Sequence, residues 1–185
     1  MKRILTTIMC CAAMAFFAYG CGGGNSAVAT DSRVPPPAAA PDWVDNPEKG
    51  CGVGTAKYRG NRGLARDAAV GRARNDLSRQ IETINQSMLK DYAAQGETDG
   101  EDFTEEQITQ VIRQVTDMTL AGTSVVKTRI QDNEFFALVC LDTQTFADAF
   151  DKMSQLSAKQ REGLNRRAKA EFKDLDATIS KIRGQ

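Results

Sequence analysis

The first 41 residues constrain the fold most, because their composition keeps them out of a packed core. The chain begins with Met1, Lys2 and Arg3, and an uncharged, mostly apolar run of sixteen residues follows at positions 4–19. A helix of sixteen residues spans about 24 Å, which is less than the roughly 30 Å of hydrocarbon in a bilayer. The run therefore predicts a signal peptide over residues 1–20 and not a membrane span.

The end of this signal peptide carries a cysteine in a distinctive setting. Ala18, Tyr19 and Gly20 are followed directly by Cys21. A small residue before a cysteine, placed right after an apolar run, resembles the lipobox of bacterial lipoproteins. The resemblance implies cleavage before Cys21 and lipidation of its thiol, and Gly22 in place of an aspartate implies export to the outer membrane. The alternatives are an uncleaved anchor, or cleavage near Ala18 or Gly20 that leaves Cys21 free.

Residues 21–41 are predicted to form a tether between the anchor and a folded body. Glycines follow Cys21, and a run of prolines at positions 35–37 leads into alanines. Such a segment has too little apolar surface to fold by itself. A flexible coil of about twenty residues averages roughly 25 Å from end to end. The folded domain is therefore expected to begin at residue 42.

The rest of the chain alternates between strand-like and helix-like hydrophobic patterns. A glycine-rich strand comes first, then two amphipathic helices separated by an acidic loop, then a β-hairpin. In chain order these predicted segments cover residues 50–56, 63–94, 95–103, 104–120, 124–130 and 135–141. The predicted class is α+β, with a small antiparallel sheet and two helices packed on one face. The domain of residues 42–150 is followed by a long helical tail, residues 151–185.

Two local signals refine this prediction. Thr104 and Gln107 have the spacing of a capping box at the start of the second helix. The second hairpin strand, residues 135–141, is apolar on both faces, so it is predicted to be central. The first hairpin strand contains Lys127 and Arg129, which places it closer to an edge.

The glycines of the first strand resemble part of a cofactor motif. Gly52 and Gly54 match the start of the dinucleotide pattern G-x-G-x-x-G, but Lys57 occupies the third glycine position and no βαβ unit follows. No cofactor is therefore predicted, and these glycines are expected to let another backbone approach closely. Gly71, inside the first helix, costs about 1 kcal/mol there and is expected to pack closely on the sheet.

Composition argues against several functions. The chain has no histidine, which excludes Ser-His-Asp and Cys-His catalysis and His-ligated zinc. Its 24 Lys and Arg residues balance 24 Asp and Glu residues, which argues against a nucleic-acid partner. The acidic stretch from Asp99 has glycine at its second position and not its sixth, so it does not match a calcium loop. No catalytic residue, metal site or enzymatic activity is predicted, because no nucleophile–base pair is recognisable.

The five cysteines divide by position. Cys10 and Cys11 belong to the signal peptide, and Cys21 is the predicted lipid site. Cys51 and Cys140 remain, each on a predicted strand and in a compartment where disulfides persist. A bridge between them would close a loop of about 90 residues, worth at most about 4–5 kcal/mol in the chain-entropy model. Two buried free thiols are the alternative.

Several motifs in this order resemble the LPP-twenty family of bacterial outer-membrane lipoproteins. They are Pro-Asp-Trp-Val at 41–44, Gly-Val-Gly-Thr-Ala at 52–56, Ala-Arg-Asn-Asp-Leu at 73–77 and Leu-Ala-Gly-Thr-Ser-Val-Val at 120–126. The resemblance implies a small α+β domain with a curved sheet and two helices on one face. It also implies a relationship to surface antigens and to flagellar basal-disc lipoproteins that assemble into rings. Trp43 is expected in the core, with ligand stacking as the alternative.

Two features bear on self-association. Apolar residues of the tail repeat with heptad spacing at Ala168, Phe172, Leu175, Ile179 and Ile182. This seam predicts packing against the body, or else pairing with a second helix. Residues 59–79 are mostly basic and residues 97–106 are acidic, so one molecule's acidic stretch could meet the next molecule's basic end. The alternative is that both charge groups are merely solvated.

The expected function follows from location more than from chemistry. We expect a non-enzymatic lipoprotein, anchored at the outer membrane through Cys21 with its domain facing the periplasm. Its expected role is structural or in assembly, with a homo-oligomer or an envelope protein as partner. A periplasmic binding module for a small ligand or peptidoglycan is the alternative.

Overall fold

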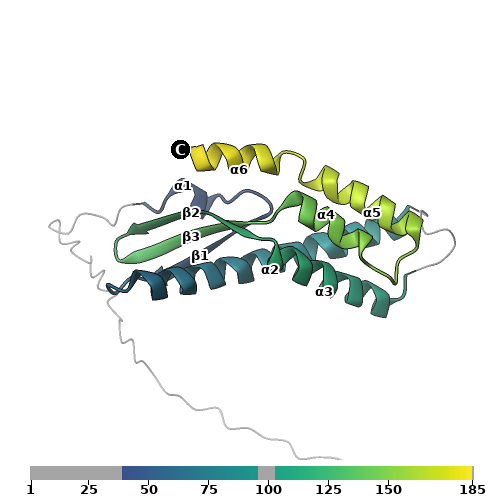
Figure 1. The fold of residues 1–185 in the computed structure, drawn as a ribbon, viewed down its shortest axis with the longest axis horizontal. Helices are drawn as coiled ribbons and strands as arrows, with labels where there is room; N and C mark the ends of the chain where they lie inside the picture. The colour runs from purple at the N-terminus through teal and green to yellow at the C-terminus, as the bar shows by residue number, and fades with distance from the viewer. Residues whose placement is uncertain (1–38, 96–102, 185) are drawn as a thin grey trace, which may run out of the picture. The chain divides into compact units, whose positions relative to one another are not determined.

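The computed structural model describes residues 39–95 and 103–184. The chain divides into two compact units, residues 1–36 and residues 37–185, and every described residue belongs to the second unit. The elements of this unit are shown in Figure 1. The predicted signal peptide, Cys21 and most of the predicted tether lie outside the described residues.

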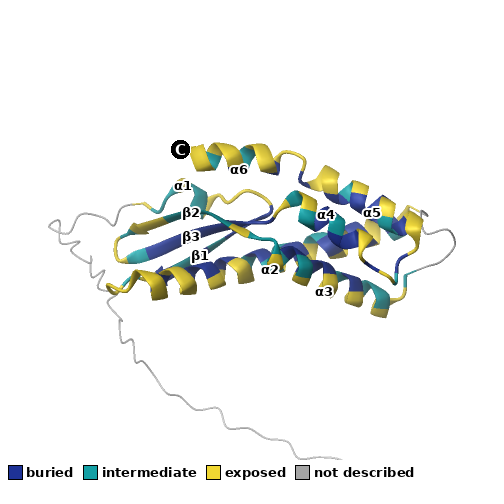
Figure 2. Ribbon diagram, in the orientation of Figure 1, coloured by how far each residue is buried: buried dark blue, intermediate teal, exposed yellow. Residues whose placement is uncertain are grey.

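A three-stranded antiparallel sheet is the centre of the unit. Its strands are β1 (Cys51–Lys57), β2 (Ser124–Gln131) and β3 (Glu134–Cys140), in the spatial order β1-β3-β2. The hairpin between β2 and β3 turns at Asp132 and Asn133, whose φ angles of 50° and 59° match a type I′ turn. The predictions of a central second hairpin strand and an edge first strand are confirmed. Figure 2 shows β3 buried along most of its length and β2 largely half-buried or exposed.

Helix α2 (Arg62–Ala94) packs on one face of the sheet, and the glycines of β1 permit its close approach. A Cβ atom on Gly52 would lie 2.2 Å from the Ala73 carbonyl oxygen. One on Gly54 would lie 2.0 Å from the Ala69 carbonyl oxygen. Only residues without a Cβ fit here, which confirms that these glycines serve backbone contact.

The prediction for Gly71 is wrong. A Cβ atom on this residue would meet nothing within 4 Å, and the residue is exposed. Ala69 and Ala73 point at β1, and Gly71 lies about 200° around the helix from Ala69. Close packing on the sheet therefore does not require a glycine at position 71.

The second predicted helix and its cap are confirmed. Helix α3 (Glu105–Ala121) begins with Thr104 as N-cap, and Thr104 and Gln107 form the reciprocal capping box. The helix packs against α2 and against α4 (Thr143–Asp151). The fold is thus α+β, as predicted, with α2 supplying the contact to the sheet.

The C-terminal tail continues as α5 (Ala158–Glu171) and α6 (Leu175–Gly184), and the chain bends between them. The tail packs with the rest of the unit in one hydrophobic core. Its heptad seam faces that core, with Ala168, Phe172, Leu175 and Ile179 buried and Ile182 half-buried. Packing against the body therefore uses the surface that a coiled-coil partner would need.

Candidate functional site

The second face of the sheet, opposite α2, is only partly covered. Side chains alternate along a strand, so Cys51, Val53 and Thr55 face away from α2 because Gly52 and Gly54 face it. The strand register places Leu138 of β3 opposite both Val53 and Lys127, on this second face. The basic residues of β2 therefore belong to the face that α2 leaves open.

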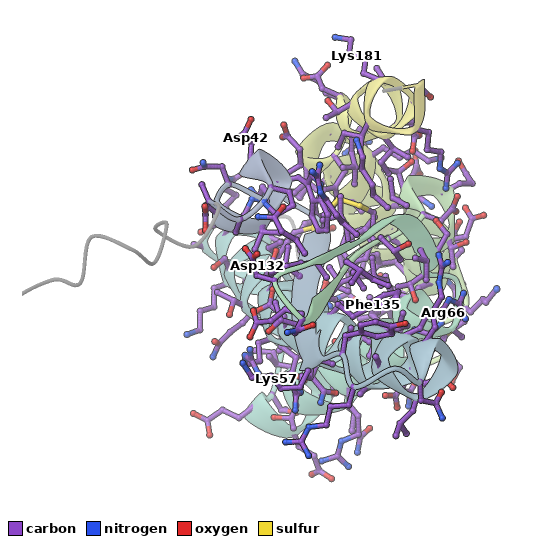
Figure 3. All side chains as sticks on the ribbon, turned by 90° about the vertical axis from the view of Figure 1, so that its left-hand side faces the viewer. Asp42, Lys57, Arg66, Asp132, Phe135 and Lys181 are labelled. Atoms are coloured by element: carbon purple, nitrogen blue, oxygen red, sulfur yellow. A yellow bond between two sulfur atoms is a disulfide. The ribbon has the colours of Figure 1, made fainter. Side chains whose placement is uncertain are left out.

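Two short helices partly cover this face. Helix α1 (Asp42–Asp45) carries Trp43, which is half-buried and packs against the hydrophobic core. The last turn of α6 lies near β2, where Arg183 Nη2 donates a hydrogen bond of 3.0 Å to Ser124 Oγ. Figure 3 shows Asp42 of α1 and Lys181 of α6 on one side of the sheet, with Phe135 and Arg66 on the other.

Between α1, β2 and α6 lies a groove of about 520 Å³. Trp43, Leu138 and Ile182 supply the large apolar side chains of its lining. The side-chain amide of Gln131 donates a 2.7 Å hydrogen bond to the Ala39 carbonyl oxygen, which ties β2 to the chain just before α1. Three segments that are distant in sequence thus build one hollow.

The charges of the groove come in both signs. Lys127 and Arg129 come from β2, and Asp42 and Glu48 come from α1 and the loop after it. None of the four makes an ion pair with another described residue, although Lys127 Nζ donates a 3.5 Å hydrogen bond to the Ile182 carbonyl oxygen. Separate cationic and anionic groups around an aromatic ring suit a ligand with an apolar body and charges of both signs, such as a short peptide.

Trp43 fits both of the alternatives left open by the sequence. Its ring packs against the core, and it also lines the groove. Trp43 is therefore both a packing residue and a candidate contact for a ligand.

The structure joins the two candidate disulfide cysteines. Cys51 and Cys140 lie directly opposite each other on β1 and β3, and their sulfur atoms are 2.01 Å apart. Both residues are fully buried. The bridge lies on the same sheet face as the groove and joins β1 to β3.

The basic stretch of residues 59–79 is partly used inside the molecule. Arg72 donates to the Thr55 carbonyl oxygen, Arg74 donates to Thr123, and Arg79 pairs with Asp76 at 3.1 Å. The acidic partner stretch lies mainly at residues 97–102, outside the described residues. The structure therefore does not bring the two charge groups together within the described part.

Sequence reasoning missed the groove, although one signal for it was present. Lys127 and Arg129 are two residues apart in a strand of otherwise neutral residues, so they share one face. That spacing indicates a basic strip on the sheet. Nothing in the sequence indicated that α1 and α6 would flank it.

No helix within residues 39–95 and 103–184 is long and apolar enough to cross a membrane. The same residues contain no cluster of three or more Cys, Asp or Glu side chains placed to hold a metal ion. No protein-family model matches the sequence, and no curated protein matches it. The likeness to LPP-twenty lipoproteins therefore rests on the motifs quoted above and stays a prediction.

Proposed function

We propose that this protein is a non-enzymatic lipoprotein, anchored at the outer membrane through an acylated Cys21 and serving a structural or assembly role in the cell envelope. The structural observation that supports export is the buried bridge between Cys51 and Cys140. Disulfides persist in oxidising compartments such as the periplasm and are rare in the cytosol. The short apolar leader and the cysteine that follows it supply the route and the anchor.

The anchoring step has a direct test in the living cell. Cys21→Ser removes the thiol that would be acylated, and Gly23→Ser is a matched control two residues away. We expect the wild type and Gly23→Ser to take up a fatty-acid probe and to fractionate with the outer membrane. Cys21→Ser should do neither. A Cys21→Ser protein that is still labelled and still sediments with the outer membrane would contradict the anchor.

The assembly role concerns the partner. A folded domain at the membrane surface that binds another envelope protein, or further copies of itself, would act as a structural link. Light scattering coupled to size-exclusion chromatography, on the full mature chain carrying Cys21→Ser, measures self-association. Multimers at micromolar concentration support self-assembly. A monomer at all concentrations would remove self-assembly and leave a different envelope protein as the partner.

The groove favours a second candidate function, binding of a small ligand. Its four charges lack ion-pair partners among the described residues, and they surround the only tryptophan of the chain. A peptidoglycan stem peptide, with amino and carboxylate groups on a short body, has matching chemistry. Trp43 fluorescence reports binding without a label. We expect Arg129→Ala to weaken binding at least tenfold and Lys90→Ala, an exposed control on α2, to leave it unchanged. Unaltered Trp43 fluorescence at millimolar peptide would exclude this ligand.

A further inference from the structure

The two edges of the sheet differ in whether side chains form hydrogen bonds with their outward-facing backbone groups. Along the outer edge of β1, three side chains of α2 bond to the strand's backbone. Asp76 Oδ2 accepts a hydrogen bond from the Val53 amide at 3.3 Å, and Gln80 Nε2 donates one to the Cys51 carbonyl oxygen at 3.1 Å. Arg72 donates to the Thr55 carbonyl oxygen in the same way. Because these side chains are four residues apart, they share one helix face and close the edge to further strands.

Within residues 39–95 and 103–184, no side chain forms a hydrogen bond with the backbone along the outer edge of β2, although α6 lies near the start of this strand, where Arg183 bonds to the Ser124 hydroxyl. No described strand pairs with this edge, because the sheet ends there. The amide and carbonyl groups of successive residues point alternately to the two sides of a strand. The contacts of β1 show that the Val53 amide and the Cys51 carbonyl point away from β3, toward the outer edge of the sheet. The same alternation, followed through the pairing of β1 with β3 and of β3 with β2, places the amide and carbonyl groups of Thr128 and Ile130 on the outer edge of β2. An edge with unpaired donors and acceptors is a template for another strand.

Exposure along β2 agrees with a free edge. Arg129 and Ile130 are exposed, and Ile130, which is 39% exposed, is unusual among the large apolar residues of the described part. The β-bulge between Val125 and Lys127 distorts pairing at the start of the strand. The regular part of the edge therefore runs from Lys127 to Gln131.

In the registers that overlap most, a second copy of β2 is a poor occupant because of charge. An antiparallel pair with its two-fold axis at residue 129 would set Arg129 against the same residue of the other copy. An axis at residue 128 would set Lys127 against Arg129. Like charges directly opposite each other destabilise a sheet. The same two cations attract a strand that carries carboxylates.

We propose that the outer edge of β2, from Lys127 to Gln131, binds an extended acidic peptide segment of a partner protein as a fourth strand. Backbone hydrogen bonds to Thr128 and Ile130 hold the segment, as in other cases of strand addition. Carboxylates at every second residue lie opposite Lys127 and Arg129 on the groove side. The residues between them lie on the other side, where an apolar one contacts Ile130. This inference depends only on the sheet and not on the membrane anchor.

The probe is a capped heptapeptide, Thr-Val-Glu-Val-Glu-Val-Thr, titrated into isotopically labelled full mature chain carrying Cys21→Ser. We expect slower hydrogen exchange at the amides of Thr128 and Ile130, and binding at least tenfold tighter than for the peptide with lysine in place of glutamate. Lys127→Glu combined with Arg129→Glu should reverse this preference. Lys90→Glu combined with Lys173→Glu, at exposed positions on α2 and before α6, is the matched charge control and should leave it unchanged.

N-methylated probes separate strand addition from charge attraction without altering the protein. Methylating those peptide amides that would point toward β2 should lower the affinity of the peptide at least tenfold. Methylating the peptide amides that would point away from β2 should leave the affinity unchanged. Equal binding by both methylated peptides would overturn the proposal in favour of charge attraction alone. So would unchanged exchange at Thr128 and Ile130, or a response confined to Trp43, which would place the peptide in the groove.

Discussion

The close contact between β1 and α2 allows a prediction in which one substitution has opposite effects at two sites. Gly54→Ala adds a Cβ atom 2.0 Å from the Ala69 carbonyl oxygen. A carbon–oxygen contact is normally about 3.3 Å or longer, so α2 would have to move by about 1.3 Å. The obstacle is backbone and cannot rotate away. We expect a loss of at least about 3 kcal/mol in the free energy of unfolding, at the upper end for overpacked cores.

Gly71→Ala is the matched control on the same helix. Its added Cβ atom meets nothing within 4 Å. Alanine in a helix interior is favoured over glycine by about 0.8–1.0 kcal/mol, so this variant should be more stable than the wild type. Urea unfolding followed by circular dichroism measures both variants. A Gly54→Ala variant that loses less than about 1 kcal/mol, or a Gly71→Ala variant that loses stability, would refute the packing argument.

Three further predictions follow from single features of the molecule. Protein exported from the cytosol and purified without reductant should show Cys51 and Cys140 protected from alkylation in intact-mass spectra, and two alkylated thiols would contradict the bridge. Asn85 is fully buried, and neither polar atom of its side chain has a hydrogen-bond partner among the described residues. Asn85→Leu should therefore raise the free energy of unfolding, measured in urea, by about 1 kcal/mol, and a decrease would contradict this reasoning. Replacing Gln80 by Ala frees the edge of β1 at the Cys51 carbonyl and should increase concentration-dependent association in light scattering, whereas Gln110→Ala should not.

Local sequence signals predicted most of the elements. The capping box at Thr104 and the apolar run of residues 135–141 each depend on neighbours in sequence, and the structure confirms both. The glycines of β1 also gave a correct prediction, because a strand with alternating glycines has one face free of side chains. The prediction for Gly71 was wrong, because the direction in which a helical residue points depends on which side of the helix meets the sheet. In α2 that side is the one that carries Ala69 and Ala73, and the local sequence around Gly71 does not identify it.

The groove depends on contacts that no local pattern encodes. Its lining comes from residues 39–48, from β2 and β3, and from Ile182 near the end of the chain. These segments meet because β1 and β2 both pair with β3 in one sheet, and because the chain bends after α5 so that α6 returns to β2. The bend follows from the heptad seam, since Phe172 and Leu175 pack against Gly50, where a Cβ atom would lie within 3 Å of both side chains. The same apolar residues that suggested a coiled-coil partner therefore fold α6 back, and in doing so they build one wall of the groove.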